Sequence, residues 1–169
     1  MPSIAPLVAT VVALAAIAGS SHRVVPHLVF NASDSVPRGW YAIEPIDRPH
    51  VGEYVLVRLP RAVRRFAADR GYIPESVPLL KQVAALGGQR VCVADDTVVV
   101  DGVAVAHTLV VDGRGQPLPT ARICRVLLDG EVFLLNVNAP ASFDSRYFGP
   151  LDRSFLRGRA TPLWTESRR

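Results

Sequence analysis

The chain has 169 residues, of which 49% are hydrophobic and 20% are charged, and its net charge is +4. This length allows one hydrophobic core, and this composition excludes a chain that is disordered throughout. The arginines are scattered and form no dense basic run with interleaved aromatic residues. The positive charge therefore does not indicate a nucleic-acid partner.

The chain begins with an apolar segment. Residues 3–19, SIAPLVATVVALAAIAG, carry no charged side chain. As a helix they would extend about 25 Å, slightly less than the hydrocarbon core of about 30 Å. The stretch predicts either a short membrane anchor or an export signal, and Ala-Ile-Ala at residues 16–18 resembles a signal cleavage site. We therefore expect a membrane-targeting segment, residues 1–22, followed by one folded domain, residues 23–169.

The rest of the chain is mostly strand-like. Residues 41–44 and 53–59 are short apolar or alternating runs, and residues 130–138, GEVFLLNVN, form a third. Residues 61–71 predict one short helix, because Pro60 precedes the run and Gly71 ends it. The pattern predicts a mainly β fold, with curled, barrel-like antiparallel sheets and one short helix.

Two hairpins are predicted between residues 89 and 107. Apolar runs are interrupted there by Asp95-Asp96 and by Asp101-Gly102, and Asp-Gly between apolar runs is a strong hairpin signal. Cys92 lies in the first of these runs, and Cys124 lies in a similar run further on. Export would place both in an oxidising compartment, so we expect a disulfide between them; the alternative is two buried thiols. No His or Cys neighbours stand at metal-ligand spacing, so we expect no metal site.

Lys81 is the only lysine in a chain that otherwise uses arginine for positive charge. It lies in the run LLKQVAAL, residues 79–86. As an extended strand, this run would place Lys81 on an apolar face with Val83 and Ala85. Burial lowers the pKa of a lysine, and a neutral amine can act as a base, which a guanidinium cannot. The alternative is a lysine at a sheet edge whose ammonium reaches solvent.

Four motifs, in this order along the chain, resemble those of a known protein family. The first is Ser35 before Val36-Pro37-Arg38-Gly39, and the second is Lys81 in its apolar strand. The third is NVNAPASFDSRYFGPL, residues 136–151, and the fourth is FLRGRATPLW, residues 155–164. Together they resemble the serine/lysine peptidases of the signal peptidase I superfamily, and most closely its TraF-type conjugative transfer members.

The resemblance implies the roles of the reacting groups. Ser35 matches the nucleophile and Lys81 matches the general base, while Val36 and Pro37 would border the substrate cleft. The backbone N–H of Ser35 would stabilise the oxyanion, and the hydroxyl of Ser33 would add a second donor. A histidine-based triad is not expected, because the four histidines lie outside every motif.

The resemblance also implies roles for the late motif. Asp144 would be part of the catalytic set, Ser145 would orient the lysine, and Arg146 would support the framework of the site. The alternative is an ordinary salt-bridged turn. Two departures from the family pattern, Val36 in place of methionine and Gly87-Gly88 in place of proline-glycine, would alter the substrate cleft rather than the chemistry.

By this resemblance, we expect a serine endopeptidase without cofactor or metal. It would process a leader-bearing precursor at the bacterial inner membrane, with its catalytic domain on the periplasmic side, or in the periplasm if the N-terminus is cleaved. The expected substrate is the pilin of a conjugative type IV secretion system, with cyclisation of the pilin as a further option. The alternatives are a general leader peptidase and a catalytically idle docking component. A self-cleaving repressor is excluded, because residues 1–30 contain an apolar segment instead of a DNA-binding domain.

Overall fold

The computed structural model describes residues 26–94 and 96–166. The predicted membrane-targeting segment lies outside these ranges. Within them, no helix is both long enough and apolar enough to cross a bilayer.

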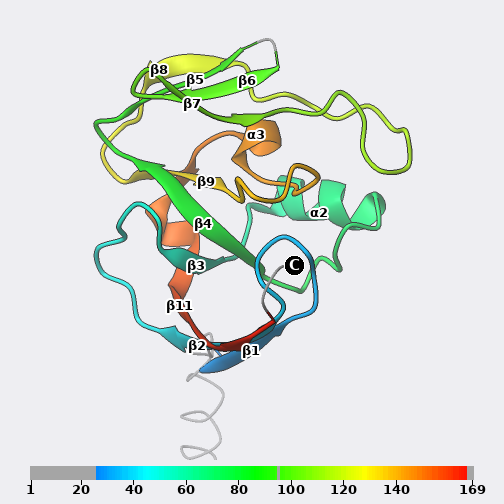
Figure 1. Cartoon of the computed structure of the whole chain (residues 1–169), viewed down its shortest axis with the longest axis vertical. Coiled ribbons are helices and arrows are strands. Elements are labelled where there is room, and N and C mark those ends of the chain that lie inside the picture. Colours follow the sequence, from blue (N-terminus) through cyan, green and yellow to red (C-terminus); the bar gives the residue numbers. More distant parts are fainter. Residues whose placement is uncertain (1–25, 95, 167–169) are drawn as a thin grey trace, which may run out of the picture.

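The body of the protein is a seven-stranded antiparallel sheet in the order β1-β2-β11-β3-β4-β9-β10 (Figure 1). Its strands are β1 (Leu28–Asn31), β2 (Gly39–Glu44), β3 (Tyr54–Val57), β4 (Leu79–Leu86), β9 (Glu131–Leu135), β10 (Leu151–Asp152) and β11 (Leu156–Thr165). The predicted mainly β, curled antiparallel fold is confirmed. β4 lies near the middle of this order, so Lys81 is carried by an interior strand and not by an edge.

A second, four-stranded sheet packs at the top of the view in Figure 1, in the order β7-β6-β5-β8. It contains β5 (Arg90–Ala94), β6 (Thr97–Val100), β7 (Val103–His107) and β8 (Ile123–Val126). Both predicted hairpins are present, and Asp101 and Gly102 have the positive φ angles, 48° and 85°, that a tight hairpin turn requires. Cys92 lies directly opposite Cys124 on the paired strands β5 and β8, and the predicted disulfide joins them.

Three apolar clusters support the sheets. One is built from residues of the large sheet, and Val63 of helix α2 (Arg61–Asp69), which matches the predicted helix, packs against it. A second cluster joins β4 and β9 to the small sheet. The third contains Val36, Tyr41 and Leu80, and lies beneath the loop that carries Ser35. The two segments that bear the predicted reacting groups are therefore anchored in one core.

Strand β11 was not predicted from the sequence. It contains Gly158 and Pro162, residues that are depleted in strands, yet it pairs with both β2 and β3. A Cβ at Gly158 would lie 2.6 Å from the carbonyl oxygen of Glu44, so a glycine is needed at this close approach. The long-range pairing, and not local propensity, determines this strand.

One outer face of the large sheet is aromatic and exposed. Phe30 of β1 pairs with Trp40 of β2, which in turn pairs with Trp164 of β11, so the three rings form one row across the strands. Their exposed fractions are 48%, 43% and 59%. Leu28, two residues before Phe30 on β1, and Leu163 of β11 are also exposed; β1 and β2 lie at the bottom of Figure 1.

Candidate active site

Ser35 lies in a loop, residues 32–38, that joins β1 to β2. Hydrogen bonds to its backbone carbonyls hold this loop in place. Asn31 donates from Nδ2 to the carbonyl oxygens of Ser33 and Val36 at 2.9 and 3.0 Å, and Tyr41 Oη donates to that of Pro37 at 2.7 Å. Val36 is 2% exposed and packs into the core. These contacts hold the half-buried Ser35 at the surface of a rigid turn.

Lys81 is 1% exposed, so the prediction of a lysine on an apolar face is confirmed. Burial lowers the pKa of its amine to about 8, the nearby negative charge of Asp144 opposes this change, and the positive charge of Arg146 favours it. At pH 7 about a tenth of the amine is therefore neutral and able to accept a proton, far more than for a lysine with an unshifted pKa.

Ser35 and Lys81 line the same cavity, which has a volume of about 330 Å³. Its other walls are mainly apolar and come from Tyr72 and Ile73 after α2, from β4, and from the segments 109–118 and 141–147. No direct hydrogen bond joins the two residues among those found in the described part of the chain. Catalytic hydrogen bonds are often long before substrate binds, so this arrangement is compatible with proton transfer.

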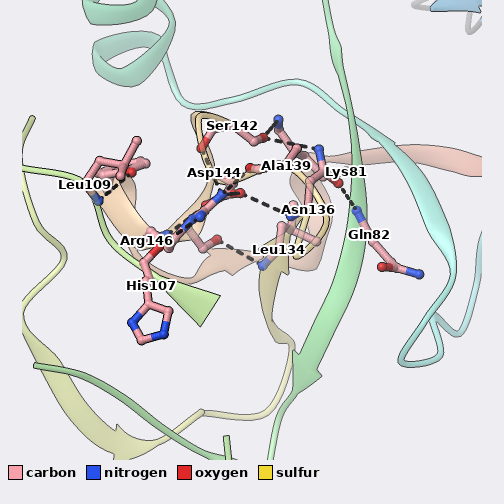
Figure 2. A network of polar contacts seen from close by, with 12 residues as sticks. Lys81, Gln82, His107, Leu109, Leu134, Asn136, Ala139, Ser142, Asp144 and Arg146 are labelled. Atoms are coloured by element: carbon pink, nitrogen blue, oxygen red, sulfur yellow. Dashed lines mark hydrogen bonds and ion pairs between the residues drawn. The ribbon is translucent and has the colours of Figure 1, made fainter. Parts of the chain in front are cut away.

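The hydroxyl that contacts Lys81 is that of Ser142, and Figure 2 shows the two side chains facing each other. Lys81 Nζ donates to Ser142 Oγ at 2.7 Å. Ser145, which the sequence led us to expect in this place, instead accepts from the backbone N–H of Leu134 at 3.0 Å. The reason is local: Asp144 caps the short helix α3 (Ser145–Phe148), and the first residue of that helix faces back toward β9. The hydroxyl that Lys81 contacts in the structure therefore lies three residues before the predicted one.

Asp144 and Arg146 form a fully buried ion pair, with side chains 0% and 1% exposed. Arg146 donates from Nε to Oδ1 and from Nη2 to Oδ2 of Asp144, both at 2.8 Å. The same guanidinium donates to the carbonyl oxygens of His107, Ala139 and Ser142 at 2.9, 3.0 and 3.2 Å. The pair therefore fixes the turn that presents Ser142 to Lys81, and it acts on Lys81 through charge rather than by a direct bond.

Ser33, the expected second oxyanion donor, also borders the cavity. Its hydroxyl donates to Asn31 Oδ1 at 2.8 Å, so it would have to rotate away from Asn31 to reach an oxyanion. Val36 and Pro37 line a small space of about 50 Å³ that Ser35 also lines. Ser35 also lines a larger, open cavity of about 610 Å³ between the loop 32–38 and residues 138–142.

The arrangement suits acyl transfer. It offers a hydroxyl at a fixed turn, an amine with a lowered pKa, and two cavities lined by the serine with space for a polypeptide chain. Within residues 26–94 and 96–166, no group of three His, Cys, Asp or Glu side chains could hold a metal ion. Sequence reasoning missed Asn31, Asn136 and Ser142; the last two lie within the motif at residues 136–151, but only their long-range contacts reveal them.

Comparison with known proteins also indicates a peptidase. The family model described as "Signal peptidase, peptidase S26" matches residues 2–164. The chain is 35% identical to a conjugal transfer protein TraF of Agrobacterium fabrum over 145 residues, which cover 80% of this chain and 81% of that protein. It is 33% identical to a plasmid transfer protein TraF of Escherichia coli over 147 residues, with the same coverage.

A solved structure, the signal peptidase I of Enterococcus faecalis V583, aligns with a TM-score of 0.41 at 21% identity, covering 68% of this chain and 97% of that one. Membership of the family rests on the family model and the TraF relatives, and not on this structure. The chain belongs to the signal peptidase family, peptidase S26, and is similar to TraF conjugal transfer proteins.

Proposed function

We propose that this protein is a membrane-associated serine endopeptidase in which Ser35 is the nucleophile and Lys81 is the general base. The observation that carries the proposal is the burial of Lys81 beside Ser142, in the cavity that also contains Ser35. The family description names a signal peptidase, and Ser35 and Lys81 lie in sequence motifs that resemble those of such peptidases.

In the proposed mechanism, the neutral amine of Lys81 takes the proton of Ser35 as Oγ attacks the scissile carbonyl. The backbone N–H of Ser35 stabilises the oxyanion of the tetrahedral intermediate. The C–N bond then breaks, and Lys81 gives its proton to the leaving amine. Water attacks the resulting Ser35 ester, again with Lys81 as base, and this step releases the acid product and restores the enzyme.

The proposed substrate is a leader-bearing precursor, specifically the pilin of a conjugative secretion system. The similarity to proteins named for conjugal and plasmid transfer supports this choice over a general leader peptidase. An amine of the pilin itself could replace water in the second step, which would yield a cyclic product. A catalytically idle docking role is disfavoured, because it requires neither a buried lysine nor a fixed serine beside it.

We place the catalytic domain on the periplasmic side of the inner membrane. The exposed row of Phe30, Trp40 and Trp164 supports contact with the bilayer surface, since tryptophan is favoured at membrane interfaces. The loop that carries Ser35 connects two strands of this face, so substrate cleavage would occur close to the membrane. The disulfide agrees with an oxidising compartment.

The test is co-expression of the pilin precursor with wild type or with Ser35→Ala, followed by mass measurement and cell fractionation. We expect wild type to convert the precursor and to reside in the membrane fraction. Ser35→Ala should leave the precursor uncut, because removal of a nucleophile of this kind costs on the order of 10⁶-fold in rate. Ser154→Ala, a distant and exposed serine, is the matched control.

The mass of the product distinguishes linear from cyclic pilin. Normal processing by Ser35→Ala would show that another residue is the nucleophile. An uncut precursor with wild type, in cells that express both proteins, would favour the docking role or a different substrate.

A further inference from the structure

Asn136, the first residue of the motif at residues 136–151, is 4% exposed and lies directly after β9. The pairing of β4 with β9 ends at Gln82 and Leu135, and the side chain of Asn136 continues it. Its Oδ1 accepts from the backbone N–H of Gln82 at 3.2 Å, and its Nδ2 donates to the carbonyl oxygen of Leu80 at 3.4 Å. These two backbone groups flank Lys81, so one carboxamide replaces a strand partner on both sides of it (Figure 2).

The same contacts fix which way the carboxamide points. The two ends of an amide are similar in shape, and their partners decide the assignment. A backbone N–H on one side and a carbonyl on the other place Oδ1 toward Gln82 and Nδ2 toward Leu80. The reverse orientation would set two donors against each other and two acceptors against each other. Nδ2 therefore also faces Ser142 Oγ, to which it donates at 3.3 Å.

We propose that Asn136 is a positioning residue, whose carboxamide orients the Ser142 hydroxyl against the Lys81 amine and fixes the backbone that carries this amine. A serine oxygen has two lone pairs. Asn136 occupies one, and an N–H of Lys81 occupies the other. The amine is thereby held with its own lone pair directed away from Ser142 and available for a proton. The catalytic consequence rests on the proposed serine/lysine mechanism, whereas the geometry does not.

The role of Asn136 can be measured through the pKa of Lys81. The charged groups that act on its amine are Asp144, which raises its pKa, and Arg146, which lowers it; Asn136 is neutral. Asn136→Asp would place a negative charge one hydroxyl away from the amine, which should raise the pKa of Lys81 by about one unit or more. Asn136→Ala would admit water beside Ser142 and weaken the effect of burial, so a smaller increase is expected.

The test uses the fact that Lys81 is the only lysine in the chain. Full-length protein labelled with [13Cε]lysine gives one side-chain resonance, whose midpoint reports the Lys81 pKa without any substrate. We expect the midpoints to increase in the order wild type, Asn136→Ala, Asn136→Asp. In cleavage assays at neutral pH, both variants should lose about tenfold or more in kcat, with KM nearly unchanged, because the base is misplaced and more often protonated.

Gln89→Ala is the matched control. Gln89 is another carboxamide that completes backbone hydrogen bonding, since its Oε1 accepts from the N–H of Leu86 at 2.9 Å, at the far end of β4. This variant should lose stability but keep the wild-type Lys81 midpoint and kcat.

Lys81 midpoints in both Asn136 variants equal to that of wild type, or unchanged kcat, would overturn the inference. If Asn136→Asp does not fold, Asn136→Ala decides the question with the same two readouts. Failure of wild type to cleave any precursor would count against the proposed function alone, because the Lys81 titration would still test the role of Asn136.

Discussion

Lys81→Arg and Lys81→Met should both abolish precursor cleavage, with losses on the order of 10³-fold or more. Arginine keeps the positive charge but does not release its proton at any working pH. Methionine keeps the approximate length and removes the charge, and a buried apolar side chain is easily accommodated at a position that is 1% exposed. The measurement is kcat/KM on a peptide that spans the leader junction.

The methionine variant distinguishes the loss of the base from a loss of folding. Arginine is larger than lysine and could disturb the core, whereas methionine should fold at least as well as wild type, because no charge is buried. A thermal melt of each variant verifies this. Cleavage by folded Lys81→Met at a rate within tenfold of wild type would show that Lys81 is not the base.

Arg146→Met should destabilise the fold by about 3–5 kcal/mol, because it leaves the Asp144 carboxylate buried without its partner. Three backbone carbonyls, those of His107, Ala139 and Ser142, would lose a donor at the same time. Urea unfolding, read by tryptophan fluorescence, gives the free energy of unfolding. Cleavage should also fall, since the turn that holds Ser142 would loosen.

Arg125→Met is the control for this second prediction. Arg125 forms a short ion pair with Glu131, but its side chain is 41% exposed. Loss of such a surface pair should cost about 1 kcal/mol or less. The double variant Arg146→Met/Asp144→Leu should recover part of the lost stability, because no unpaired charge remains although the three carbonyls still lack their donor. Equal effects of Arg146→Met and Arg125→Met would contradict the structural role assigned to the buried pair.

Several features of the fold and the site could be predicted from the sequence because local signals determine them. Strand β4, helix α2 and the hairpins follow from hydrophobic periodicity and from proline, glycine and Asp-Gly signals. The burial of Lys81 follows from the apolar residues around it, and the disulfide follows from two cysteines in neighbouring strand-like runs.

The partners inside the site could not be predicted, because contacts between distant segments determine them. Lys81 and Ser142 are 61 residues apart, and the turn that brings them together depends on the carbonyls bound by Arg146. Ser142 and Ser145 are equally plausible in the sequence. Only the capping of α3 by Asp144 directs Ser145 toward β9 and leaves Ser142 beside the lysine. Strand β11 was missed for a similar reason, since its pairing with β2 and β3 outweighs its weak local propensity.

If the neutral amine of Lys81 is the base, two pH dependences must agree. One is kcat/KM for cleavage of a precursor peptide, and the other is the titration of the [13Cε]lysine resonance of Lys81. Since only the neutral amine accepts a proton, we expect cleavage to decrease about tenfold per pH unit below the Lys81 pKa of about 8. The two midpoints should coincide. A cleavage rate that is independent of pH through the measured Lys81 titration would contradict the proposed mechanism.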